Sequence, residues 1–141
     1  MLFLSLSIAI TAFIFSNSLQ SGEISGNQSD FFVDAFDNAL SFFGISADTQ
    51  ILGVIIRKAA HFTEYFALGL TSSLFLSVFE RKPLYTISPI YALVIAICDE
   101  FIMQSVTEGR APRWTDVIID LSGAVIAGLI IYLIKNRKQK V

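Results

Sequence analysis

Two separated stretches of the chain carry side chains that could do acid–base chemistry. In the first, His61 and Glu64 stand one helical turn apart; in the second, Asp99 and Glu100 are adjacent. A histidine beside carboxylates can transfer protons, and the same groups can ligate a divalent metal ion. However, one histidine and three carboxylates are a weak zinc signal, and no local motif pairs a Ser or Cys nucleophile with His61. Whether the protein is an enzyme stays open, and no metal or cofactor is predicted.

Four cations near these residues suggest a different chemistry. Arg57 and Lys58 belong to the first stretch, and Arg110 and Arg113 follow the second. The planar guanidinium of arginine suits bidentate recognition of a phosphate or carboxylate, and neighbouring acids would orient it. A binding site for an anionic ligand is therefore the second interpretation. The remaining polar candidates in these stretches are Tyr65, Gln104, Asp116 and Asp120.

The elements that must position these residues are long apolar segments. Apolar residues make up 54% of the 141-residue chain, charged residues make up 16%, and the mean hydropathy is +0.66. A helix needs roughly 20 apolar residues to cross a hydrocarbon core of about 30 Å. We therefore predict an all-α membrane protein, a four-transmembrane-helix bundle forming a single domain over residues 1–141. The predicted crossings are residues 2–19, 59–79, 85–102 and 117–134.

Composition also narrows the class of protein. No Lys or Arg precedes the first apolar segment, which favours a retained helix over a cleaved signal peptide. The single cysteine, Cys98, excludes an internal disulfide. A formal net charge of −2 and the absence of any zinc-finger, Walker or Gly-rich dinucleotide pattern give no sign of nucleic-acid or nucleotide binding. The expected partner of the protein is the lipid bilayer that surrounds its helices.

The distribution of charge predicts the orientation in the membrane. Lys and Arg concentrate in cytoplasmic loops, and here they mark the C-terminal tail from Lys135 and the turn that holds Arg81 and Lys82. The acidic segment over residues 20–57 and the turn over residues 103–116 then lie outside. We expect a multi-pass protein of the cell membrane with both termini in the cytoplasm.

The first outer segment is predicted to have two parts. Residues 16–29 are rich in Ser, Asn and Gly, which is typical of an irregular loop. Residues 30–43 have apolar side chains at helical spacing, which predicts a short amphipathic helix, either in the outer interface or capping the bundle. Ser46 or Asp48 then offers an N-cap for the next helix, which is expected to begin near Thr49.

The last apolar segment carries small residues at a spacing of four. Gly123 is followed by Ala127, and Ala124 by Gly128. Such repeats let helix backbones approach closely in a membrane. We expect them to serve packing.

Antiparallel crossings would bring the polar residues together. Helices two and four would begin outside and helix three would end there, so their polar ends should meet above one leaflet. On helix two, Arg57, His61 and Glu64 share a face, and the acids of helix three should lie opposite. Asp99 is expected to point about 100° away from Glu100. This convergence is the strongest functional signal in the sequence.

These two stretches also resemble the signatures of a known family. Residues 57–65, with the motif RKAAHFTEY and Gly69 after it, resemble the first signature of the VanZ-like family. The Phe15–Ser18 exit of the first helix is weakly similar to that family's first loop. The second signature has its counterpart, at matching spacing, in Asp99, Glu100, Gln104, Gly109, Arg110, Asp116, Asp120 and Gly123.

The resemblance implies a role at the cell envelope. The family is named for a protein associated with low-level resistance to the glycopeptide teicoplanin. The expected ligand is therefore a glycopeptide or a lipid-linked wall precursor, and the protein is expected to contribute to resistance against teicoplanin. Two alternatives remain: an acid–base or metal-dependent enzyme acting on an envelope lipid, and a network of structural ion pairs. The predicted binding residues are Arg57, Lys58, His61, Glu64, Tyr65, Asp99, Glu100, Gln104, Arg110, Arg113, Asp116 and Asp120, of which His61, Glu64, Asp99 and Glu100 are also the catalytic candidates.

Overall fold

The computed structural model describes residues 1–79 and 87–138, and every regular element within these ranges is a helix. The turn with Arg81 and Lys82, which the charge argument used, lies outside the described residues, as do Tyr85 and Lys140. The elements are α1 (Leu2–Ser18), α2 (Gly22–Phe42), α3 (Thr49–Leu76), η1 (Ser77–Phe79), α4 (Ile87–Cys98), η3 (Asp99–Met103), η4 (Gln104–Val106) and α5 (Trp114–Lys138).

The close packing of α3 against α5 is the centre of the fold. A Cβ placed on Gly69 would lie 2.5 Å from the Cα of Ala124, and one on Gly123 would lie 2.5 Å from the carbonyl oxygen of Phe62. Only glycine allows backbones this near to one another. Ala127 is also fully buried, and Gly128 faces Ser73. The packing role predicted for the small residues of the last helix is confirmed.

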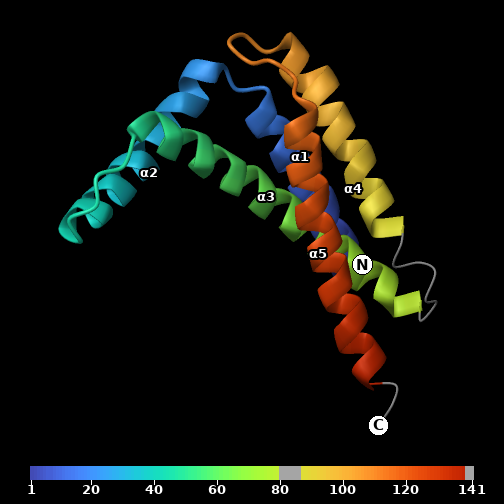
Figure 1. The fold of residues 1–141 in the computed structure, drawn as a ribbon. Helices are drawn as coiled ribbons and strands as arrows, with labels where there is room; N and C mark the ends of the chain where they lie inside the picture. Colours follow the sequence, from blue (N-terminus) through green and yellow to red (C-terminus); the bar gives the residue numbers. More distant parts are fainter. Residues whose placement is uncertain (80–86, 139–141) are drawn as a thin grey trace.

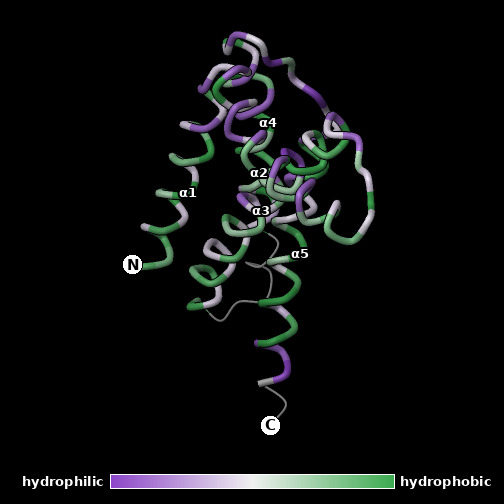
Figure 2. The backbone as a smooth tube through the Cα atoms, turned by 90° about the vertical axis from the view of Figure 1, so that its left-hand side faces the viewer, coloured by the Kyte–Doolittle hydropathy of each residue, from purple (hydrophilic) through white to green (hydrophobic). Residues whose placement is uncertain are grey.

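The helices of the bundle alternate in direction. α1 ends, α3 begins, α4 ends and α5 begins towards the end of the molecule where residues 107–113 connect α4 to α5, and the start of α1 and the end of α5 lie towards the opposite end (Figure 1). Hydrophilic segments gather around this connection and reappear near the C-terminus, with mostly apolar helix between them (Figure 2). This arrangement brings the polar parts of several helices to one end.

The segment after α1 differs from the prediction. The loop expected over residues 16–29 is wrong: α1 continues to Ser18, and α2 begins at Gly22 and runs to Phe42. Ser21 caps α2 by accepting a hydrogen bond from the backbone N–H of Ile24 at 3.4 Å. The Gly22 N–H donates to the carbonyl of Glu108 at 2.9 Å, so the α4–α5 connection holds the start of α2. This tertiary contact overrides the low helix propensity of a stretch rich in Ser, Gly and Asn.

The start of α3 agrees with the sequence. Asp48 is the N-cap, and its carboxylate accepts hydrogen bonds from the backbone N–H groups of Gln50 at 2.8 Å and Ile51 at 3.4 Å. The helix then continues for 28 residues. It therefore extends well before residue 59, where the predicted crossing begins.

Length and composition allow three or four membrane spans among the described residues. Three helical stretches qualify alone: Thr49–Phe79, Ile87–Val106 and Trp114–Arg137. α1 and α2 qualify only as a pair, which is bent by 106°. The chain is thus an all-helical protein with apolar helices suited to a membrane.

Candidate functional site

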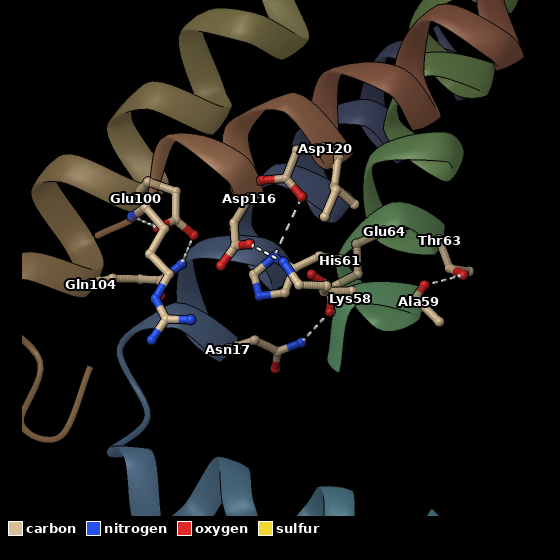
Figure 3. Close-up of polar contacts among 12 residues, drawn as sticks. Asn17, Lys58, Ala59, His61, Thr63, Glu64, Glu100, Gln104, Asp116 and Asp120 are labelled. Carbon is tan, nitrogen blue, oxygen red and sulfur yellow. Dashed lines mark hydrogen bonds and ion pairs between the residues drawn. The ribbon is translucent and has the colours of Figure 1, made fainter. Parts of the chain in front are cut away.

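The polar residues of four helices meet at the end of the bundle where α4 joins α5. α3 contributes Lys58, His61 and Glu64 from its middle part, and α5 contributes Asp116 and Asp120 from its first two turns (Figure 3). Glu100 comes from η3 and Gln104 from η4, both of which continue α4. The polar end of α1 adds Asn17. The contacts described below confirm that these helix ends converge, while their role in binding stays a prediction.

The core of the cluster is one histidine surrounded by three acids. His61, Asp99, Glu100 and Asp120 each present one potential ligand atom, and these four atoms all lie within 4.8 Å of one another. Asp99, Glu100 and Asp120 are completely buried. His61 is 13% exposed, and its Nδ1 lies 3.5 Å from Oδ1 of Asp120. The group can exchange protons, and its composition also suits a cation.

A π-helical turn carries the two consecutive acids of the cluster. In a regular α-helix, Asp99 and Glu100 would point about 100° apart, as the sequence analysis expected. The chain instead forms a wider π-turn over Asp99–Met103, and both carboxylates are buried in the cluster. Such turns are rare and frequently mark functional sites. The expected difference in direction along the helix does not keep either acid out of the cluster, because their carboxylate oxygens lie within 4.8 Å of each other.

Glu100 is the acid with the most fixed orientation. Its Oε1 accepts a hydrogen bond from the side-chain amide of Gln104 one turn later. Its Oε2 accepts another from the backbone N–H of Arg113, at 3.0 Å. The two donors hold opposite sides of the carboxylate and tie the end of α4 to the start of α5.

Asp99 and Asp120 are in the opposite situation. No hydrogen bond reaches any of their four carboxylate oxygens among the residues that the structure describes, although Oδ1 of Asp120 forms the 3.5 Å ion pair with Nδ1 of His61. Tyr65 follows His61 by one turn, is also fully buried, and its hydroxyl likewise has no partner within the described ranges. Buried polar groups without partners are uncommon, because each loses its hydration. These atoms therefore point to a component that completes the site.

Glu64 lies apart from this core. Its Oε1 accepts a hydrogen bond from the side-chain amide of Asn17 at 2.8 Å, and Glu64 is not among the four clustered groups. Glu64 remains close enough to His61 to interact with it electrostatically, and its role as a catalytic or binding residue stays a prediction. Asp120, rather than Glu64, is the fourth member of the cluster. The reason is that α1 ends beside α3 and supplies the amide that Glu64 binds.

The end of α1 is the part of the site that the list of predicted residues omits. Besides binding Glu64, Asn17 accepts a hydrogen bond at its backbone carbonyl from Nη2 of Arg110, at 3.1 Å. The carbonyl of Ser18 accepts from the hydroxyl of Thr107 at 3.1 Å. The one available signal was the weak resemblance of the Phe15–Ser18 stretch to the family's first loop.

Lys58 and Asp116 form the ion pair at the edge of the cluster. Nζ of Lys58 lies 2.6 Å from Oδ1 of Asp116, and the side chains are 35% and 17% exposed. The contact joins α3 to the start of α5. Because both groups keep contact with solvent, its main effect is to orient Lys58.

Two cavities adjoin the cluster, and His61 lines both of them. The smaller, of about 130 Å³, lies among α1, α2 and α3 beside Asn17 and Glu64. The larger, of about 700 Å³, lies between α2, α3 and residues 104–116. The larger cavity is lined by all four predicted cations, Arg57, Lys58, Arg110 and Arg113, and by the acids Asp30, Asp34 and Asp116.

The cations of the larger cavity are mostly free of acidic partners. Lys58 is the one with an ion pair among the described residues; Arg110 binds the carbonyl of Asn17. Burial lowers the pKa of the Arg110 guanidinium, and the nearby positive charge of Arg57 lowers it further. Arginine nevertheless stays protonated at any physiological pH. The larger cavity therefore presents positive charge that an anion can neutralise.

Comparison with known proteins decides the family. The family model described as VanZ/LLP1 matches residues 3–135. The chain belongs to this family. Searches of curated proteins and of solved structures found no match. In this VanZ/LLP1 protein, the matched range contains the buried acids, His61, the four cations and both cavities.

Proposed function

We propose that this VanZ/LLP1 protein spans the cell membrane four times and binds an anionic envelope molecule at its outer surface. In the proposed topology α1, α3, α4 and α5 cross the bilayer, with both termini in the cytoplasm. α2 then lies along the outer interface. Its 106° bend from α1 supports this placement, and so do Phe31, Phe32 and Phe36, whose side chains are 72%, 52% and 55% exposed. Lys135 and Arg137 at the end of α5 favour a cytoplasmic C-terminus.

The ligand is a molecule that carries a phosphate or carboxylate. The observation that carries this proposal is the larger cavity, where Arg57, Arg110 and Arg113 have no acidic partner among the described residues. Arginine binds both groups through paired hydrogen bonds, and partial removal of water strengthens the interaction. A volume of about 700 Å³ falls in the range of cavities that hold drug-sized groups.

Membership of the family supports one biological class of ligand. A lipid-linked wall precursor carries phosphates and a glycopeptide carries carboxylate, and both occur on the outer side of the membrane. Binding of either one would change how teicoplanin reaches its target. We therefore propose that the protein contributes to glycopeptide resistance through this cavity.

Direct binding tests the proposal. The protein would be reconstituted in nanodiscs and titrated separately with teicoplanin and with a lipid-linked pyrophosphate precursor. Arg57→Ala should weaken binding of the true ligand at least tenfold, and Arg57→Lys should restore only part of it, because lysine keeps the charge but not the paired geometry. Raising salt should weaken binding further. If both ligands fail to bind, or if Arg57→Ala and Arg113→Ala bind as wild type, the larger cavity is not the binding site.

A matched control separates local from general charge effects. Arg137 lies near the far end of α5 and lines neither cavity. Arg137→Ala should leave binding unchanged. In cells, susceptibility to teicoplanin should follow the affinities of the Arg57 variants at equal amounts of membrane-inserted protein.

An enzyme acting on an envelope lipid is the second candidate. It is favoured by one observation, the buried His61 and acids beside a cavity that could admit a headgroup. The histidine would accept or donate a proton in such a reaction. Incubation with lipid-linked precursors, followed by chromatography of the products, tests this candidate; absence of turnover with each precursor would reject it. A purely structural ion-pair network is less favoured, because such a network should satisfy its own members: Asp120 pairs with His61, but the carboxylate of Asp99 has no hydrogen bond among the described residues.

A further inference from the structure

The four groups at the core of the cluster have the spacing of metal ligands. A first-row divalent ion lies about 2.0–2.2 Å from each nitrogen or oxygen ligand, so two ligands on one ion are at most about 4.4 Å apart. The four potential ligand atoms of His61, Asp99, Glu100 and Asp120 fall within 4.8 Å of one another. The 3.5 Å between Nδ1 of His61 and Oδ1 of Asp120 is close to the edge of a tetrahedral site, about 3.4 Å. Small side-chain rotations would complete the coordination.

The unpartnered atoms are a second and independent observation. Asp99 and Asp120 are completely buried, and none of their carboxylate oxygens has a hydrogen-bond partner among the described residues. The facing Nδ1 of His61 has no hydrogen bond among these residues either, and meets Asp120 only in the 3.5 Å ion pair. Carboxylates are seldom buried in this way unless they are paired or coordinate a metal ion. A cation among them would satisfy these groups together.

Glu100 already has the support that a ligating carboxylate needs. Gln104 and the backbone N–H of Arg113 donate to its two oxygens from outside the cluster. Each oxygen keeps a second lone pair for an ion. Hydrogen bonds of this kind fix the orientation of metal ligands in known sites.

We propose that His61, Asp99, Glu100 and Asp120 bind one divalent first-row transition-metal ion, of the Mn²⁺ or Zn²⁺ class. The imidazole disfavours Mg²⁺ and Ca²⁺, which prefer oxygen ligands alone, and the three carboxylates disfavour Cu⁺, which prefers sulfur. Three negative charges around a divalent ion leave one excess negative charge, and the guanidinium of Arg110 is near enough to Asp99 and Glu100 to interact with them electrostatically. The metal site is separate from the anion-binding function and does not depend on it.

The test uses the purified full-length protein in detergent, carrying an affinity tag without histidine. After chelator treatment it is titrated with Mn²⁺ alone, and binding is followed by electron paramagnetic resonance. We expect one ion per chain, displaced by Zn²⁺. His61 is the only histidine of the chain. A strong imidazole-nitrogen coupling in the pulsed spectrum of bound Mn²⁺ therefore identifies this site and no other.

Isosteric variants provide the second measurement. Asp99→Asn and Asp120→Asn each keep the shape of the side chain but remove a charged ligand, and each should weaken Mn²⁺ binding about 100-fold. His61→Gln should abolish the nitrogen coupling. Asp37→Asn is the matched control, because Asp37 lies on α2 and lines neither cavity; it should bind as wild type.

Three results would overturn the proposal. The first is the lack of saturable binding at one ion per chain. The second is binding that survives both Asp99→Asn and Asp120→Asn, which would place the ion on surface acids. The third is the lack of imidazole coupling in the wild-type protein, a result that decides the question even if the variants fail to fold.

Discussion

A single methyl group added to Gly123 should both destabilise the bundle and loosen the site. The new Cβ would lie 2.5 Å from the carbonyl oxygen of Phe62 and 3.1 Å from the N–H nitrogen of Phe66. Ordinary contacts begin at 3.4 Å. Both obstructing atoms belong to the backbone of α3, so they cannot turn aside. In Gly123→Ala, α3 and α5 must therefore separate locally by almost 1 Å.

The free-energy change follows from two opposing terms. Alanine favours a helix over glycine by about 1 kcal/mol. Forcing an extra carbon into a close-packed interface costs about 1–3 kcal/mol, and the upper part of this range applies because the neighbours are backbone. We expect Gly123→Ala to lower the free energy of unfolding by about 1–2 kcal/mol after both terms.

Gly26 supplies a control with the opposite expected sign. It lies within α2, and a Cβ placed there meets nothing within 4 Å. Gly26→Ala should therefore raise the free energy of unfolding by about 0.5–1 kcal/mol, through helix propensity alone. Reversible unfolding in mixed micelles, followed by circular dichroism, measures both variants under one condition.

The same displacement should reach the polar cluster. Phe62 follows His61 directly, and Asp120 lies less than one turn before Gly123. Separation of the two helices would lengthen the 3.5 Å between His61 and Asp120. Mn²⁺ binding by Gly123→Ala should weaken about tenfold, a loss typical of displaced metal ligands. If Gly123→Ala is as stable as wild type, or gains stability as Gly26→Ala does, the close approach of α3 and α5 is refuted.

Three further changes test other contacts. Asn17→Ala should lower the free energy of unfolding by about 1–3 kcal/mol, measured in mixed micelles, because Glu64 loses a hydrogen bond in partly buried surroundings; an unchanged value would contradict the contact. Lys58→Met should cost at most about 1 kcal/mol in the same assay, since its ion pair is partly exposed; a much larger loss would mean that the pair is buried. In a cysteine-free background, a membrane-impermeant maleimide should label Glu23→Cys on intact cells, but Lys135→Cys only after permeabilisation; the reverse pattern would invert the proposed topology.

Sequence alone gave much of the helical framework. The apolar segments near residues 59–79 and 117–134 lie within helices, because a length of apolar sequence sufficient for a membrane is a property of composition. Asp48 was predictable as one of two caps, because its side chain interacts within its own turn. The meeting of polar helix ends followed from the alternation of helix direction. These inferences need only local or topological information.

Which residues form the polar cluster could not be predicted from the sequence in the same way. Asp99 and Glu100 lie on a π-turn, whose extra residue leaves no mark in a hydrophobic pattern, and their entry into one cluster with Asp120 depends on how three helices pack. Glu64 turned to Asn17, a residue 47 positions away in the chain. Spacing along one helix defines a face but not the neighbour that the face meets.

Helix α2 shows that the intrinsic helix propensity of a segment does not decide its structure alone. Ser, Gly and Asn at its start favour a loop, and a short peptide of this sequence would form little helix on its own. The contact of Gly22 with residues 108–109 fixes the first turn from outside. The sequence contains the residues of that contact but not their distance in space.

The length of α3 makes the lipid composition part of the chemistry. Its 28 residues form a rod of about 42 Å, roughly 12 Å more than an average hydrocarbon core. Longer acyl chains would draw the first turns of α3 into hydrocarbon, whereas shorter ones would leave them among water and headgroups. This excess corresponds to about eight residues, and Lys58 and His61 follow just after them, at the edge of the core, so the depth at which a ligand meets them would change with acyl-chain length. The protein would then respond to how a cell adjusts its fatty acids, without any dedicated lipid-binding residue.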